Sequence, residues 1–178
     1  TPEGVSLRKA FLRTPVEFSR ISSRFTMARR HPVLNTIRAH KGVDYAAPTG
    51  TPVRATSDGI VAFKGVKGGY GNVIELQHGS RFQTVYAHLS GYSRSLYRGK
   101  RVKQGDVIGY VGKTGLASGP HLHYEFRVDG IHRNPLTVKF AQSAPVENKY
   151  RDEFNRHSQQ LFAHLDVMRR AMLALNTQ

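Results

Sequence analysis

A pair of histidines separated by one residue is the feature of this sequence that most clearly suggests chemistry. His121 and His123 flank Leu122 in a run of residues that favours a β-strand. Because side chains two positions apart in a strand point to the same face, the two imidazoles line one face and Leu122 packs on the other. Glu125 and Arg127 continue the histidine face. Two imidazoles on one wall can share a metal ion, or one can bind it while the other transfers protons. Two hydrogen-bonded structural histidines fit this pair equally well.

A histidine and a carboxylate occur four residues apart upstream, at His40 and Asp44. Nitrogen and carboxylate oxygen together form a donor set that suits zinc. Gly42 and the proline-containing segment 45–52 exclude a helix, so the pair is expected on a strand or a loop. Taken alone, an exposed loop histidine beside a turn-capping aspartate is the favoured interpretation of this motif.

A further histidine, His88, closes the strand-like run 81–89. Strict alternation predicts that His88 shares one face with Thr84 and Tyr86, so that a mostly apolar stripe carries it inward. A single histidine in such a position is more often a satisfied core residue than a catalyst. Its occurrence together with the other two clusters favours a site.

Composition limits the class of protein. The 178 residues, 39% of them hydrophobic, predict one domain that is large enough to bury a core, and no apolar run is long enough to span a membrane. The chain begins with Thr1 and shows no signal peptide, so we expect a processed or trimmed portion of a longer protein. Without cysteine, any metal site must use His, Asp or Glu.

The charge balance is strongly basic, with 27 Lys and Arg against 12 Asp and Glu and a net charge of +15. Such a field attracts polyanions, which include nucleic acid, anionic lipid and acidic cell-wall polymers. The basic residues are scattered and form no recognisable nucleic-acid motif. A solvated basic surface is therefore favoured first and an envelope polyanion second, and no nucleic-acid partner is expected.

The region from Pro48 to Val128 has the pattern of a β protein. Short β-branched or aromatic runs bounded by glycines recur at 59–63, 72–76, 82–89 and 107–111. They predict a compact antiparallel sheet.

From about Glu147 the period changes, and apolar residues recur at steps of three, four or seven, which predicts an amphipathic helix. Docking of this helix on its own β domain is the favoured interpretation, and a partner or dimer helix is the alternative.

Taken in order, His40-x-x-x-Asp44, His88 and His121-x-His123 resemble the peptidoglycan-cutting zinc metallopeptidases of the lysostaphin/LytM type. The flanking sequences are similar too: His-Lys-Gly-Val-Asp-Tyr, Pro-Thr-Gly-Thr-Pro-Val, Gly-Tyr-Gly-Asn, Tyr-Ala-His-Leu and Ser-Gly-Pro-His-Leu-His-Tyr-Glu. The resemblance covers about residues 20–140. The segment 20–25 and the extended C-terminus look most like the Gram-negative murein D,D-endopeptidases of that family.

The resemblance implies a mainly β fold, in which a curved antiparallel sheet forms a core with a metal-binding groove. It implies one zinc ion per chain, held by His40, Asp44 and His123. It also implies that His88 and His121 are the catalytic histidines, without deciding which of them acts as the base.

The resemblance also suggests a division of the chain. Residues 1–20 are expected to be an N-terminal arm or a remnant of an upstream domain, and residues 21–140 the LytM-type metallopeptidase domain. Residues 141–178 are expected to be a helical extension that docks on this domain. Because members of the family are often held inactive by upstream segments, an autoinhibitory segment before this chain is a further expectation.

The expected activity is zinc-dependent hydrolysis of peptidoglycan cross-links in the periplasm or cell envelope. The Gram-negative resemblance implies a D-alanyl–diaminopimelate bridge, and a pentaglycine bridge is the competing substrate. Four loop residues are plausible groove-lining residues, although ordinary turn chemistry accounts for them equally well: Tyr70, Asn72, Thr114 and Ser118. The alternative function is a non-catalytic LytM-type module that binds and activates another wall hydrolase. Such modules have typically lost zinc ligands, whereas all five positions are intact here.

Overall fold

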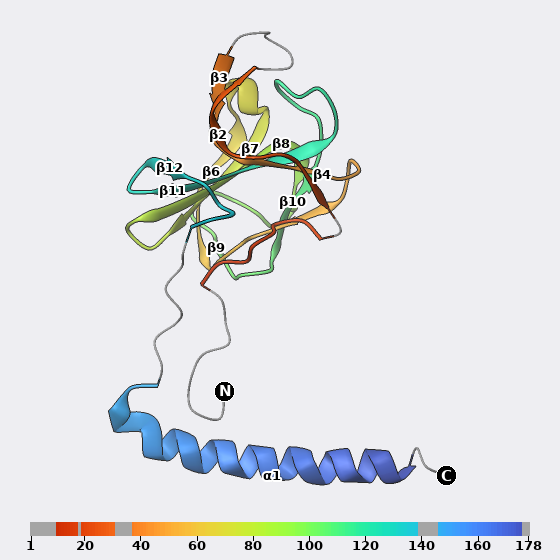
Figure 1. Ribbon diagram of the computed structural model, residues 1–178, viewed down its shortest axis with the longest axis vertical. Coiled ribbons are helices and arrows are strands. Elements are labelled where there is room, and N and C mark those ends of the chain that lie inside the picture. Colours follow the sequence, from red (N-terminus) through yellow and green to blue (C-terminus); the bar gives the residue numbers. More distant parts are fainter. Residues whose placement is uncertain (1–9, 18, 31–36, 139–145, 176–178) are drawn as a thin grey trace. The chain divides into compact units, whose positions relative to one another are not determined.

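The computed structural model describes residues 10–17, 19–30, 37–138 and 146–175 (Figure 1). The chain divides into two compact units. The unit Phe11–Lys139 contains the β-strands, and the other unit contains the C-terminal helix.

Short strands rich in β-branched and aromatic residues make up the unit Phe11–Lys139. In chain order they are β1 (Arg20–Ser23), β2 (Thr26–Arg30), β3 (Ile37–His40), β4 (Val43–Ala46), β5 (Pro52–Arg54), β6 (Gly59–Val66), β7 (Asn72–His78), β8 (Phe82–Tyr92), β9 (Arg101–Val102), β10 (Val107–Val111), β11 (His121–Val128) and β12 (Ile131–Arg133). A 3-10 turn, η1 (Gly68–Tyr70), joins β6 to β7. All four runs that the sequence predicts as strands lie within β6, β7, β8 and β10.

In the described part of the chain, ten strands form one antiparallel sheet with the order β1-β4-β11-β8-β7-β6-β9. Strand β10 pairs with β8 and β5, and β12 pairs with β11. Strands β2 and β3 form a separate two-stranded ribbon. The large sheet is open and curved, as Figure 1 shows. The predicted mainly β, antiparallel architecture is confirmed.

One face of the central strands forms the core. On β11, Leu122, Tyr124 and Phe126 are buried, as the alternation predicts. The hydroxyls of Tyr124 and Tyr86 each lie 3.0 Å from the hydroxyl of buried Thr56, so the aromatic core also satisfies its polar atoms. Since every second residue of β11 packs in this core, the residues between them point to the opposite face.

The second unit contains a 3-10 turn, η2 (Asn148–Tyr150), and a helix, α1 (Arg151–Leu175), which confirms the predicted C-terminal helix. Its large apolar side chains are exposed at several positions: Leu161, Phe162, Leu165, Val167, Met168 and Met172. Docking of α1 on the β unit stays a prediction. None of the helices in the described residues combines the length and the apolar character that crossing a lipid bilayer requires.

Candidate metal centre

Neighbouring strands collect the predicted site residues. Strand β11 lies between β4 and β8, and its register sets His123 opposite Asp44 on one side and opposite Ala87 on the other. His40 is the last residue of β3, four residues before Asp44. Sheet pairing therefore brings together side chains that are far apart in the sequence.

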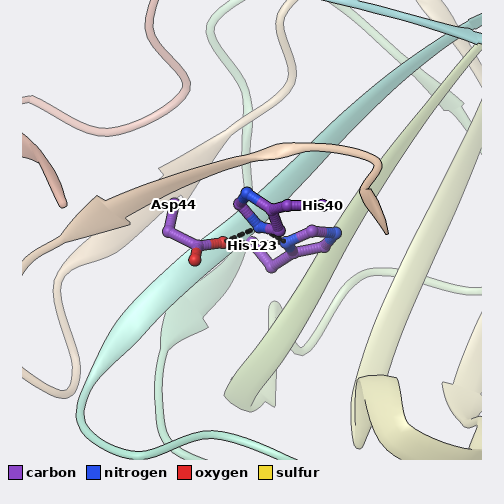
Figure 2. Close-up of side chains that lie close together, drawn as sticks. All are labelled: His40, Asp44 and His123. Carbon is purple, nitrogen blue, oxygen red and sulfur yellow. Dashed lines mark hydrogen bonds and ion pairs between the residues drawn. The ribbon is translucent and has the colours of Figure 1, made fainter. Parts of the chain in front are cut away.

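Three donor atoms meet at this point. Oδ1 of Asp44 lies 2.9 Å from Nε2 of His40 and 2.8 Å from Nδ1 of His123, and the two nitrogens are 3.2 Å apart. Figure 2 shows the carboxylate and both rings pointing toward one another. Among the residues that the structure describes, this is the one group of His, Asp and Glu side chains with the geometry to hold a metal ion.

The chemistry of the three donors fits zinc. Two imidazole nitrogens and one carboxylate oxygen form a three-ligand set that leaves a fourth tetrahedral position open, as catalytic zinc sites do. The outer ring nitrogens are already engaged, because Nδ1 of His40 donates to the carbonyl of Arg24 at 2.9 Å and Nε2 of His123 donates to Glu125 at 3.2 Å. These bonds orient the two rings, so that Nε2 of His40 and Nδ1 of His123 are the nitrogens that face Asp44.

His88 reaches the same face through a β-bulge. Strand β8 has one more residue than β7 between the pairs Asn72–Leu89 and Ile74–Tyr86. His88 has a φ of 60°, in the left-handed region that non-glycine residues rarely adopt. Tyr86 stays in the core, whereas the ring of His88 lies beside the site histidines. The prediction that His88 and Tyr86 share one face of the strand is therefore wrong, because the bulge reverses the direction of the His88 side chain.

His88 and His121 lie beside the three donors, and each bonds a backbone carbonyl through Nδ1. Their ring centroids are 4.7 Å apart, and that of His88 is 5.8 Å from that of His123. Nδ1 of His88 bonds the carbonyl of Thr114 at 2.8 Å. Nδ1 of His121 bonds the carbonyl of Gly119 at 2.8 Å. Because a carbonyl only accepts, both rings carry a hydrogen on Nδ1, and Nε2 is the nitrogen left for proton transfer.

Comparison with known proteins identifies the family. The model of peptidase family M23 matches residues 38–135, a span that contains all five predicted metal-binding and catalytic positions. The chain belongs to peptidase family M23. Peptidoglycan DD-endopeptidase ShyC from Vibrio cholerae is 44% identical over 163 residues, which cover 92% of this chain and 37% of that protein. DD-carboxypeptidase/endopeptidase Mpg from Neisseria meningitidis is 53% identical over 124 residues, which cover 70% of this chain and 28% of that protein. The chain thus spans roughly a third of the length of these relatives.

Solved structures share the fold of this M23 chain. A zinc-containing peptidase from Vibrio cholerae matches with a TM-score of 0.69 and 36% identity, over 76% of this chain and 42% of that chain. The catalytic domain of lysostaphin from Staphylococcus simulans matches with a TM-score of 0.59 and 30% identity, over 66% of this chain and 90% of that chain. The resemblance to the lysostaphin/LytM type that the motifs predict is confirmed.

Charges inside the M23 site compensate one another. Burial raises the pKa of Asp44, but hydrogen bonds and charges from His123 and His40 hold it well below its usual range. Burial lowers the pKa of His123, but the hydrogen bonds and charges of Asp44 and Glu125 raise it to about 9. Asp44 is therefore an ionised acceptor, and His123 is held between two carboxylates.

Glu125 is a member of the site to which the sequence assigned no role. Its side chain is 1% exposed, and its carboxylate bonds Nε2 of His123 at 3.2 Å and the hydroxyl of Tyr70 at 2.7 Å. The carboxylate also bonds Nε and Nη2 of Arg127, at 2.9 and 2.5 Å, and Nε2 of His132 at 3.0 Å. Burial raises the pKa of Glu125, and the groups around the carboxylate, His123 first, lower it to about 2. The signal in the sequence was the alternation that places Glu125 on the histidine face.

The four predicted groove residues have different surroundings. The ring of Tyr70 lies 6.0 Å from that of His123. The side chains of Asn72 and Thr114 bond a backbone carbonyl of β8, at 3.0 and 2.8 Å. Ser118 is exposed in the segment between β10 and β11. Contact of these four residues with a substrate stays a prediction.

Proposed function

We propose that this chain is a zinc-dependent endopeptidase that hydrolyses peptide cross-links of bacterial peptidoglycan. The observation that carries the proposal is the convergence of His40, Asp44 and His123 beside two further histidines that keep Nε2 available. Membership of family M23 supports it, as do the activities for which the relatives ShyC and Mpg are named.

His40, Asp44 and His123 are the residues that would hold one zinc ion per chain. When bound, zinc supplies a Lewis acid that polarises a carbonyl group and lowers the pKa of water to about 7. The protein supplies fixed ligand positions, because the carbonyl of Arg24 and the carboxylate of Glu125 restrain the two rings from behind.

His88 and His121 are proposed to move protons. Burial lowers the pKa of His88 to about 4, with a further contribution from the nearby histidines, so its ring is neutral near neutral pH. A neutral ring with Nε2 free can take a proton from an attacking water molecule and later give it to the leaving amine. These roles are assigned to the two rings jointly.

The proposed scissile bond is the D-alanyl–diaminopimelate bridge, because ShyC and Mpg are both named for action on D,D bonds. A pentaglycine bridge is the competing substrate. The net charge of +15 favours contact with acidic wall polymers. This substrate implies a location in the periplasm or elsewhere in the cell envelope. An upstream segment that covers the site stays a prediction.

Digestion of purified cross-linked peptidoglycan, with the products separated by mass, tests the proposal. The chain is assayed beside His40→Ala, a chelated sample and His157→Ala, in which an exposed histidine of α1 is replaced. We expect the unchanged chain and His157→Ala to convert dimeric muropeptides to monomers. His40→Ala and the chelated sample should not, and added zinc should restore the chelated sample.

The mass of the products names the bond that is cut. A chain that binds zinc and leaves every cross-link intact would contradict the endopeptidase proposal. The non-catalytic module would then be preferred, and its test is activation of a separate wall hydrolase by the same preparation.

A further inference from the structure

His88 has a backbone conformation that depends on its surroundings. Its φ of 60° is one that non-glycine residues keep only where neighbouring groups leave no alternative. The residue is also buried, so protein groups make up most of the surroundings of its ring. The groups that hold His88 in the bulge therefore determine where its ring points.

Thr114 contacts the bulge at two points. Its carbonyl accepts the Nδ1–H of His88 at 2.8 Å, and its hydroxyl donates to the carbonyl of Leu89, the next residue, at 2.8 Å. The same hydroxyl accepts the backbone N–H of Asn72 at 2.9 Å. One residue thus contacts both the ring and the backbone of the bulge, and ties them to β7.

Close backbone packing fixes Thr114 itself. A Cβ at Gly115 would lie 2.4 Å from the nitrogen of Gly71, and a Cβ at Gly71 would lie 2.4 Å from the carbonyl carbon of Thr114. The N–H of Leu116 donates to the carbonyl of Gly69 at 2.8 Å. The segment that carries Thr114 therefore lies directly against the η1 turn, with no room for a side chain at either glycine.

We propose that Thr114 is a positioning residue for His88, whose carbonyl and hydroxyl together keep the ring in the Nδ1–H tautomer with Nε2 as its acceptor. Thr114 acts through His88 and does not touch the reacting atoms. The catalytic importance of this tautomer rests on the proposed function, whereas the tautomer itself does not.

Thr114→Val tests the proposal, because valine keeps the shape of threonine and removes the hydroxyl that ties the segment to β8. Thr114→Ser restores the hydroxyl, and Thr137→Val makes the same exchange at an exposed threonine. Two-bond 15N–1H correlation spectra of the imidazoles report the tautomer at about pH 8, where unpaired histidines are neutral. The signals of His88 are assigned by their loss in His88→Gln.

We expect only the Nδ1–H form of His88 in the unchanged chain, in Thr114→Ser and in Thr137→Val. Thr114→Val should show an added Nε2–H population. Its kcat on cross-linked peptidoglycan should fall about 10- to 100-fold, with KM and zinc content unchanged, since the misplaced group is a proton carrier and not a ligand.

A second pair of variants displaces the segment that carries Thr114 by a different route. Gly115→Ala and Gly99→Ala both place alanine at a positive φ, of 73° and 89°, but only the first meets backbone atoms. Gly115→Ala should change the tautomer of His88, and Gly99→Ala should not.

A pure Nδ1–H tautomer in both Thr114→Val and Gly115→Ala would overturn the proposal, whatever the rates. If no variant, including the unchanged chain, cuts peptidoglycan, the proposed function fails, while the tautomer spectra still decide the role of Thr114.

Discussion

Replacement of Glu125 by glutamine should weaken both the fold and the metal centre. Glutamine has nearly the same shape as glutamate but lacks the charge that Arg127 and His123 face. Removing one partner of a buried ion pair typically costs about 3–5 kcal/mol, because the other charge stays buried. The Glu125 side chain is 1% exposed and that of Arg127 16%, so we take the lower end, about 3 kcal/mol.

Two measurements test this value. At about 2–4 °C per kcal/mol for a chain of this size, the Tm of Glu125→Gln should fall by about 6–12 °C. Loss of the carboxylate behind the proposed ligand His123 should lower zinc affinity by about 10- to 100-fold, measured by competition with a chelating dye. Asp129→Asn is the matched control, because it makes the same exchange in an exposed pair with Arg81.

The control should melt and bind zinc like the unchanged chain. If Glu125→Gln does so too, Glu125 neither supports the strand nor orients His123, and the reasoning from its contacts is refuted.

Two other outcomes are expected from buried positions elsewhere in the β unit. Gly112→Ala places a Cβ 2.2 Å from the backbone nitrogen of Ser90 and should lower the free energy of unfolding in urea by about 1–3 kcal/mol. Gly91→Ala, with open space around the added Cβ, should leave it unchanged. Equal urea midpoints for the two variants would contradict the close packing at Gly112. Burial lowers the pKa of His78 from 6.5 in spite of its bond to the carbonyl of Asp58. The unfolded chain therefore takes up this proton first, and stability present above about pH 6.5 should be lost as the pH falls toward the folded pKa. His78→Asn should show a smaller loss over this window in unfolding titrations, and parallel curves for the two proteins would count against the assignment.

The sequence was sufficient to predict the parts of the site that follow from regular alternation. His121, His123 and Glu125 share a face of β11 because nothing interrupts its pleat, and the short runs between glycines form the strands that they predict. The pairing of His123 with Asp44 depends on the register between β11 and β4, which the spacing of the motifs does not contain. That His123 and Asp44 belong to one site was predicted from the resemblance to a family.

The position of His88 shows where such reasoning stops. Its strand carries an extra residue that no glycine marks, and the reason lies in contacts from Thr114, which follows β10. A bulge that is stabilised by a distant segment leaves no local signal. Alternation places Glu125 on the histidine face, but it does not predict the partners of its carboxylate. Tyr70 and His132 come from η1 and β12, and only the folded sheet brings them together.

The three donors belong to two different pieces of architecture. Asp44 and His123 are on the large sheet, whereas His40 ends the β2–β3 ribbon. Gly42, which lies between His40 and Asp44 in the sequence, packs so closely that a Cβ there would lie 2.6 Å from the ring of His123. A two-stranded ribbon is marginally stable by itself. An ion shared by all three side chains would be a reversible cross-link that fastens the ribbon to the large sheet. Amide hydrogen exchange in the ribbon would then follow metal occupancy while β8 and β11 stay protected. With that result, metal would enter and leave by opening of the ribbon, without unfolding of the large sheet.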